Sequence, residues 1–203
     1  MTASSSNGVT RKSRRTLLLN TRKIERGYAL ILEGMGFDWK KDPHMSQTPS
    51  RAMRAMVTEI CSGLFEDPPV MTTFPLEGNS NMVISRKIPI KSLCAHHLLP
   101  FIGYATVAYI PRETILGLSK LSRAVEYMMR RPQVQEQLTE NIADFLQAQL
   151  DGPIGIGVVI QSRHFCMELR GVKHESEVLT STLRGEFEKA EVRSEFLHLA
   201  GVR

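Results

Sequence analysis

The sequence predicts an α+β fold in a single domain. Three observations carry this prediction. Apolar residues recur at helical spacing near the N-terminus, β-rich segments lie on both sides of a cysteine-histidine turn at residues 94–97, and two further helical segments precede the last strands. The length of 203 residues and the hydrophobic fraction of 42% suit one soluble domain with a sizeable core.

The first two predicted helices lie before the β-rich part of the chain. The first covers residues 24–35, where apolar residues recur at helical spacing and Gly36 follows as a terminating glycine. The second follows Thr48, which can cap it, and has Pro49 in its first turn. The apolar stripe of this second helix includes Cys61 and is expected to be core.

The middle and C-terminal parts of the chain alternate between strands and helices. Residues of high β-propensity predict the strands, and a proline opens the longest predicted helix. The strand after that helix is expected to deliver Cys166, and a last strand and short helix complete the chain. The predicted strands cover residues 82–85, 104–110 and 154–161, and the helices cover residues 120–130 and 132–150.

The positive charge is confined to the N-terminus. Residues 1–23 contain six of the 26 lysine and arginine residues and none of the 21 acidic ones, so the net charge of +5 belongs to a tail. We expect this tail to be disordered and residues 24–203 to form the domain, and nucleic-acid binding is not expected. Arg14 and Arg15 precede three leucines as in a twin-arginine export signal, but charged residues return at once, so export is not expected.

The cysteine count favours a reducing, cytoplasmic setting. Three cysteines in 203 residues are too few, and odd in number, for a disulfide framework. A disulfide between two of them remains an alternative on the sequence alone. No apolar run approaches the roughly 20 residues that span a bilayer, so no membrane segment is expected.

Cys94, His97 and Cys166 are the candidate metal ligands. A C-x-x-H pair spans one tight turn and can aim a thiolate and an imidazole at one tetrahedral ion, and the distant cysteine completes three ligands. Three protein ligands leave one position for water, as in catalytic zinc sites. His96 could be a fourth ligand, but consecutive side chains point in different directions, so we assign it a role beside the metal. Iron(II) or cobalt would also suit this ligand set.

Two predicted helix starts carry candidate binding residues. Ser119, Lys120 and Arg123 surround the first, where free N–H groups and the helix dipole favour an anion such as phosphate. A capping serine with solvated charges is the alternative. At the second, Glu136 could accept two N–H bonds from a planar base such as guanine, or simply complement the dipole.

The order of these segments resembles the GTP cyclohydrolase I family. The motifs C-x-H-H-L-L-P-F, G-L-S-K-L-x-R, R-R-P-Q-V-Q-E-Q-L-T, H-x-C-M-x-x-R-G-V and T-S-T follow one another over residues 94–182. The resemblance extends over roughly residues 24–203. Several long motifs in one order are a far more specific signal than any single spacing.

The resemblance implies a zinc enzyme that opens the purine ring of GTP. Cys94, His97 and Cys166 match the family's zinc ligands, and the zinc lowers the pKa of a bound water toward about 7, so that hydroxide attacks carbon 8 of the guanine. His164 matches the histidine that protonates N7, and His96 matches a second histidine that assists while formate leaves. The ribose then rearranges and the ring recloses to give 7,8-dihydroneopterin triphosphate, without an organic cofactor.

The same resemblance assigns the substrate contacts. Glu136 and Gln135 match a pair that anchors the guanine, and four further positions match those that hold the triphosphate and ribose. These positions are Ser119, Lys120, Arg123 and Arg170. The product would feed folate, biopterin or 7-deazaguanine synthesis, a choice that the sequence does not make.

For fold and assembly, the resemblance implies the tunnelling fold, an antiparallel sheet with two helices layered on one face. It also implies a homodecamer of two pentamers with active sites at the subunit interfaces. Such an assembly suits a small domain with a single sheet, because closing strands into a barrel across subunits removes exposed sheet edges.

One position departs from the family. Glutamate commonly stands between the first cysteine and the two histidines, and here that position is Ala95. Losses at outer-shell positions of metal sites typically cost about 10- to 100-fold in affinity or activity, so we expect reduced or retuned activity. Two alternatives stay open: a related zinc hydrolase that stops at a ring-opened product, and a non-catalytic zinc-bound assembly subunit. The presence of His96 and His164 argues against the second.

Overall fold

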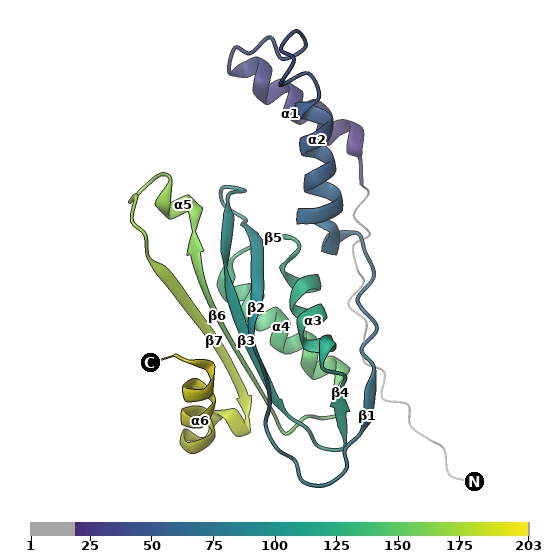
Figure 1. The fold of residues 1–203 in the computed structure, drawn as a ribbon, viewed down its shortest axis with the longest axis vertical. Helices are drawn as coiled ribbons and strands as arrows, with labels where there is room; N and C mark the ends of the chain where they lie inside the picture. Colours follow the sequence, from purple (N-terminus) through teal and green to yellow (C-terminus); the bar gives the residue numbers. More distant parts are fainter. Residues whose placement is uncertain (1–18, 203) are drawn as a thin grey trace, which may run out of the picture.

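The computed structural model describes residues 19–202, which form a fold built on one five-stranded sheet (Figure 1). The central strands run antiparallel, whereas the two-residue edge strand runs parallel to its neighbour. In sheet order, the strands are β5 (Pro132–Gln133), β2 (Val83–Cys94), β3 (Pro100–Ile110), β6 (Gly155–His164) and β7 (Glu177–Gly185). Residues 1–18 of the predicted basic tail lie outside the described residues, and their disorder stays a prediction, whereas residues 21–23 belong to the first helix.

Two helices cover one face of this sheet. α3 (Ser119–Met129) lies against β2, and α4 (Gln135–Gln149) lies against β6 and β7 (Figure 1). Alternate strand residues such as Val107 and Val158 point into the core that these helices close. The α+β class and the two helices on one face of the sheet, as the tunnelling fold implies, are therefore confirmed.

The opposite sheet face is covered only in part. The C-terminal helix α6 (Ala190–Ala200) and the short 3₁₀ turn Glu186–Glu188 pack there, with Phe187 and Phe196 meeting edge to face in a second, smaller core. Ile102 and Tyr104 remain on this face with 43% and 58% of their surface exposed. A hollow of about 640 Å³ lies beside them, and no cysteine or histidine lines it.

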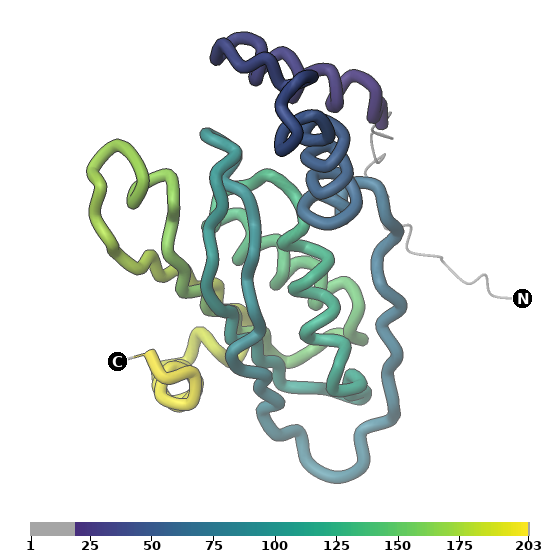
Figure 2. The backbone as a smooth tube through the Cα atoms, turned by 45° about the horizontal axis from the view of Figure 1, so that its top comes forward, coloured from purple at the N-terminus to yellow at the C-terminus, as the bar shows by residue number. Residues whose placement is uncertain are grey.

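The N-terminal helices extend away from the sheet (Figures 1 and 2). α1 (Thr21–Gly34) begins three residues before the predicted start because the Asn20 side chain accepts a hydrogen bond from the Lys23 N–H and caps the helix. Gly36 follows with a φ of 85°, as expected of a terminating glycine. α1 packs against the following helix, which leaves Ile24 and Tyr28 half-buried, but it buries no residue fully, and Leu30 and Ile31 are more than half exposed.

The second helix differs from its prediction in two ways. α2 (Thr48–Ala55) starts with Thr48 as a helical residue, so the predicted cap is wrong, and Gln47 at the cap position makes no side-chain bond. The chain then widens into the π-helical turn Met56–Ile60 and a 3₁₀ turn, and the predicted core residue Cys61 is indeed buried.

The remaining differences arise from pairing between distant segments. Pro132 was expected in the first turn of a helix, but it pairs with Leu93 as part of β5. A separate two-stranded sheet, β1 (Thr73–Pro75) with β4 (Thr114–Leu116), was not predicted. Among the described residues, no helix is both long and apolar enough to cross a membrane.

Candidate metal centre and adjoining pocket

The candidate ligands lie on the turn that follows β2 and on the short helix that follows β6. Cys94 is the last residue of β2, and its carbonyl accepts the Leu98 N–H at 2.8 Å, which closes the tight turn that carries His97. The short helix α5 (Phe165–Glu168) directly follows β6 and carries Cys166. Because Phe101 pairs with the last residue of β6, the register of β3 and β6 places α5 beside this turn.

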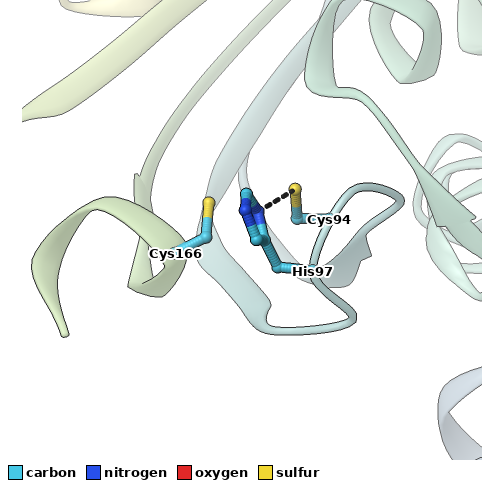
Figure 3. A group of neighbouring side chains, drawn as sticks. All are labelled: Cys94, His97 and Cys166. Carbon is cyan, nitrogen blue, oxygen red and sulfur yellow. Dashed lines mark hydrogen bonds between the residues drawn. The ribbon is translucent and has the colours of Figure 1, made fainter. Parts of the chain in front are cut away.

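The three side chains form one compact group (Figure 3). A ligand atom from each of Cys94, His97 and Cys166 lies within 4.8 Å of the others, and all three cysteines of the chain are free. Burial is the largest cause that raises the pKa of the Cys166 thiol, and the neighbouring Cys94 sulfur raises this pKa further. A cation between the two sulfurs would favour the thiolates that metal binding requires.

Two further side chains lie against this group. Nδ1 of His96 is 3.8 Å from the Cys94 sulfur, while Nδ1 of His97 is 3.9 Å from the same atom. Arg170, predicted as a phosphate ligand, places Nη1 2.7 Å from Nε2 of His97. A guanidinium only donates, so Nε2 accepts here. Ligation of a metal through Nδ1 would move the ring proton to Nε2 and break the contact with Arg170.

A pocket of about 280 Å³ adjoins the cysteines and contains the predicted proton donor His164. The imidazole of His164 stacks on buried Phe101, with ring centroids 4.8 Å apart and an interplanar angle of 9°. Burial lowers the pKa of His164, and the carboxylate of Glu136 opposes this shift. The other lining residues are Cys94, His96, Gln133, Val134, Gln135, Cys166, Met167 and Val178.

The two residues predicted to anchor guanine lie differently. Glu136 is exposed in the first turn of α4 and lines the pocket. Gln135 is only 1% exposed, and its side-chain amide bonds to β6 and β7, including the Thr180 hydroxyl of the T-S-T motif. Its oxygen is 2.7 Å from Nε2 of His164 and accepts a hydrogen bond from Ser162. Ser162 lies in none of the sequence motifs, and Phe101 ends the motif C-x-H-H-L-L-P-F without a role that the sequence predicts.

The predicted phosphate ligands Ser119, Lys120 and Arg123 do not join this group within one chain. They lie in the first turns of α3, while the far end of that helix leads to β5 beside Cys94. An 11-residue helix is roughly 16 Å long, so Ser119 and Lys120 lie at the opposite end of α3 from the metal group, and Arg123 lies about one turn further along. Lys120 donates to the Val70 carbonyl at 2.7 Å, and Arg123 lines a separate pocket with Glu66 and Arg130.

The family match and the sequence relatives agree on one family. The family described as GTP cyclohydrolase I matches residues 24–201. GTP cyclohydrolase 1 of Pelotomaculum thermopropionicum is 47% identical over 175 residues, which cover 85% of this chain and 92% of that protein. GTP cyclohydrolase 1 of Geobacillus kaustophilus is 45% identical over 186 residues, 89% of this chain and 97% of that protein. A solved structure, apo archaeosine synthase QueF-Like, gives a TM-score of 0.40 at 21% identity, over 52% of this chain and 96% of that chain.

Proposed function

Because the chain belongs to the GTP cyclohydrolase I family and is an enzyme of this type, we propose that it carries out the complete zinc-dependent reaction on GTP. In this reaction the guanine is hydrolysed at carbon 8, formate is released and the product is 7,8-dihydroneopterin triphosphate. The observation that carries the proposal is the convergence of Cys94, His97 and Cys166 beside a pocket that contains His164 and Glu136.

Cys94, His97 and Cys166 would hold the zinc. Two sulfurs and one imidazole nitrogen within 4.8 Å of one another suit zinc, whereas magnesium and calcium prefer sets of oxygen ligands. When bound, zinc supplies the Lewis-acid chemistry that activates water at neutral pH.

His164 is the proposed proton donor to N7 of the guanine. Two contacts hold its ring. Stacking on Phe101 fixes the ring plane, and the contact of Gln135 with Nε2 fixes the rotation of the ring within that plane. Such a rigid imidazole beside the metal ligands suits general acid–base catalysis. His96 lies next to Cys94 and is the proposed second proton carrier.

Glu136 is the proposed guanine anchor, because its carboxylate is exposed to the pocket and can accept two parallel N–H bonds from a planar base. For the triphosphate we propose Arg170 from the same chain, together with Ser119, Lys120 and Arg123 from a second copy. The separation of these last three from the metal group within one chain supports a site shared between subunits.

A homodecamer of two pentamers is the proposed assembly. The partly uncovered sheet face with Ile102 and Tyr104, and the exposed Leu30 and Ile31 of α1, support burial against other copies. The cytoplasmic location stays a prediction from the cysteine count.

The direct test is to incubate the purified protein with GTP, with and without a chelator, while assaying formate and identifying products by mass spectrometry. We expect formate in equal amount to a product with the mass of dihydroneopterin triphosphate, and we expect chelation to abolish both. A ring-opened formamide without formate would indicate the truncated reaction that Ala95 leaves open. Unchanged GTP with a metal-loaded oligomer would indicate a non-catalytic subunit.

A further inference from the structure

We propose that Gln135 is a positioning residue that fixes His164 as the Nε2-protonated tautomer, and that its side chain does not hold the guanine. This inference rests on the proposed function, because it assigns a role within the same site. It revises the contact that the family resemblance implies for position 135.

The orientation of the Gln135 amide follows from its backbone partners. Its nitrogen lies 3.1 Å from the carbonyl oxygen of Ile160 and 2.9 Å from that of Val178. Backbone carbonyls only accept hydrogen bonds, so the NH₂ group must face them. The reversed amide would place its oxygen against both carbonyls in a buried site, where unpaired acceptors are costly. The amide oxygen therefore faces His164.

This orientation determines the tautomer of His164. The amide oxygen of Gln135 can only accept, and Nε2 of His164 lies 2.7 Å from it, so Nε2 carries a proton. In the neutral ring, Nδ1 is then the unprotonated nitrogen, so His164 donates a proton to the guanine only as the imidazolium, from Nδ1 after this atom has taken up a proton. Stacking on Phe101 holds the ring plane, so the imidazole keeps both its plane and its tautomer before substrate binds.

The other contacts of Gln135 leave its amide without capacity for a ligand. The Ser162 hydroxyl donates to the amide oxygen at 2.5 Å, which occupies the second lone pair. The Thr180 hydroxyl is a third acceptor, 3.1 Å from the amide nitrogen, so two of the three acceptors share one of the two N–H groups. The Thr139 hydroxyl uses its proton to donate to the backbone carbonyl of Gln135. It can therefore accept the proton of the Thr180 hydroxyl, whose oxygen is 2.6 Å away. A guanine contact through this side chain would break a buried and complete network.

Replacement of Gln135 separates positioning from binding. Gln135→Leu removes the acceptor for His164, and we expect kcat for formate release to fall by about 100-fold, the lower end of what a positioned acid–base group contributes. The KM for GTP should be unchanged. In the His164→Ala background, the same replacement should cause no further loss of kcat, because a residue that acts only through His164 has nothing left to position.

Gln135→Glu keeps the proposal testable if the leucine variant fails to fold. A buried carboxyl beside two carbonyls favours its protonated form, which donates to a carbonyl through O–H and accepts from His164 through C=O. We therefore expect kcat of the glutamate variant to lie well above that of the leucine variant. A glutamate variant as inactive as the leucine variant would contradict the proposed role.

The tautomer itself can be read from nitrogen-15 spectra of histidine-labelled protein, with His164→Ala used to assign the His164 signals. We expect a protonated Nε2 and an unprotonated Nδ1 in the wild type, and a mixture of tautomers in Gln135→Leu. Gln133→Leu is the matched control, since Gln133 is also buried and donates to the Met128 and Met129 carbonyls, yet has no bond to His164. Its His164 signals should match the wild type.

Two results would overturn the inference: a wild-type His164 protonated at Nδ1, or a Gln135→Leu enzyme whose loss lies in the KM for GTP. A wild-type protein that releases no formate from GTP would instead overturn the proposed function. The nitrogen spectra separate these failures, because they test the geometry of Gln135 and His164 without turnover.

Discussion

The two ends of α3 differ in how completely one chain builds them. At the β5 end, Cys94, His97 and Cys166 converge and His164 is held by a stacked ring and an amide. At the other end, Ser119 and Arg123 are exposed, and only Lys120 is tied to the chain, through a bond to the Val70 carbonyl.

This difference matches what each group is expected to do. Groups that move protons must be held close to the reacting geometry, and burial with complementary hydrogen bonds provides that order. Charges that attract a triphosphate act over longer distances and tolerate mobile side chains. One chain therefore brings the proposed chemical groups together, and we propose that the anion-binding groups of a second copy complete the site.

The largest effect is expected at the metal group. Cys166→Ser removes one of three ligands, so the purified protein should lose bound zinc, and turnover should fall by more than the roughly 100-fold typical of outer-shell losses. Metal analysis and formate release measure the two effects. Cys61→Ser is the control, because Cys61 is also a free, buried cysteine but does not belong to the group of candidate ligands. A Cys166→Ser protein with normal zinc content would contradict the ligand assignment.

The second-largest effect is expected from the loss of His164, the proposed proton donor. His164→Ala should lower kcat by about 10²- to 10⁴-fold while zinc content stays unchanged, because His164 contacts Gln135 and Phe101 and is not a proposed ligand. His198→Ala, an exposed histidine in α6, serves as the control and should keep normal turnover. Normal kcat in His164→Ala would refute its role as proton donor.

Changes at the other end of α3 should act on binding. Arg123→Ala removes one charged contact to the proposed triphosphate, typically about 1.5–3 kcal/mol, so the KM for GTP should rise by roughly 10- to 100-fold. Zinc content should be normal, since Arg123 lines a pocket that contains none of the three candidate ligands. Steady-state kinetics check this, and an unchanged KM would remove Arg123 from the proposed anion site.

The smallest effect is expected at Ala95, where the family commonly has glutamate. Ala95→Glu restores the common carboxylate beside the Cys94 turn, and should raise zinc affinity or turnover by less than about 10-fold, because position 95 is exposed and outer-shell effects begin near that size. Competition with a chromogenic chelator measures the affinity. A lower affinity in Ala95→Glu would show that alanine is the better residue in this chain.

The sequence predicts best those features that depend on neighbouring residues. The C-x-x-H turn, the helical start of α3 and the glycine that follows α1 are local, and the structure contains all three. Helical periodicity also located α1, although it could not show that part of its apolar stripe, including Ile31, stays exposed. A pattern along the chain identifies a face but not the partner of that face.

The features that the sequence did not predict depend on distant partners. β5 exists only because Pro132 and Gln133 meet the end of β2, and β1 only because it meets β4. The contacts of Gln135 with Ile160 and Val178 span 25 and 43 residues. Motif order placed Gln135 in the site, but its buried amide and its bond to His164 required the register of β6 and β7.

The most direct test of a shared site is to mix two damaged copies. His164→Ala lacks the proposed proton donor and Arg123→Ala lacks a phosphate contact, so each assembly alone should release formate poorly at low GTP. If one site takes His164 from one copy and Arg123 from the next, dissociating and co-assembling the two variants should create some intact sites and restore formate release. A co-assembled mixture no more active than the average of its parents would contradict a site completed by a second copy.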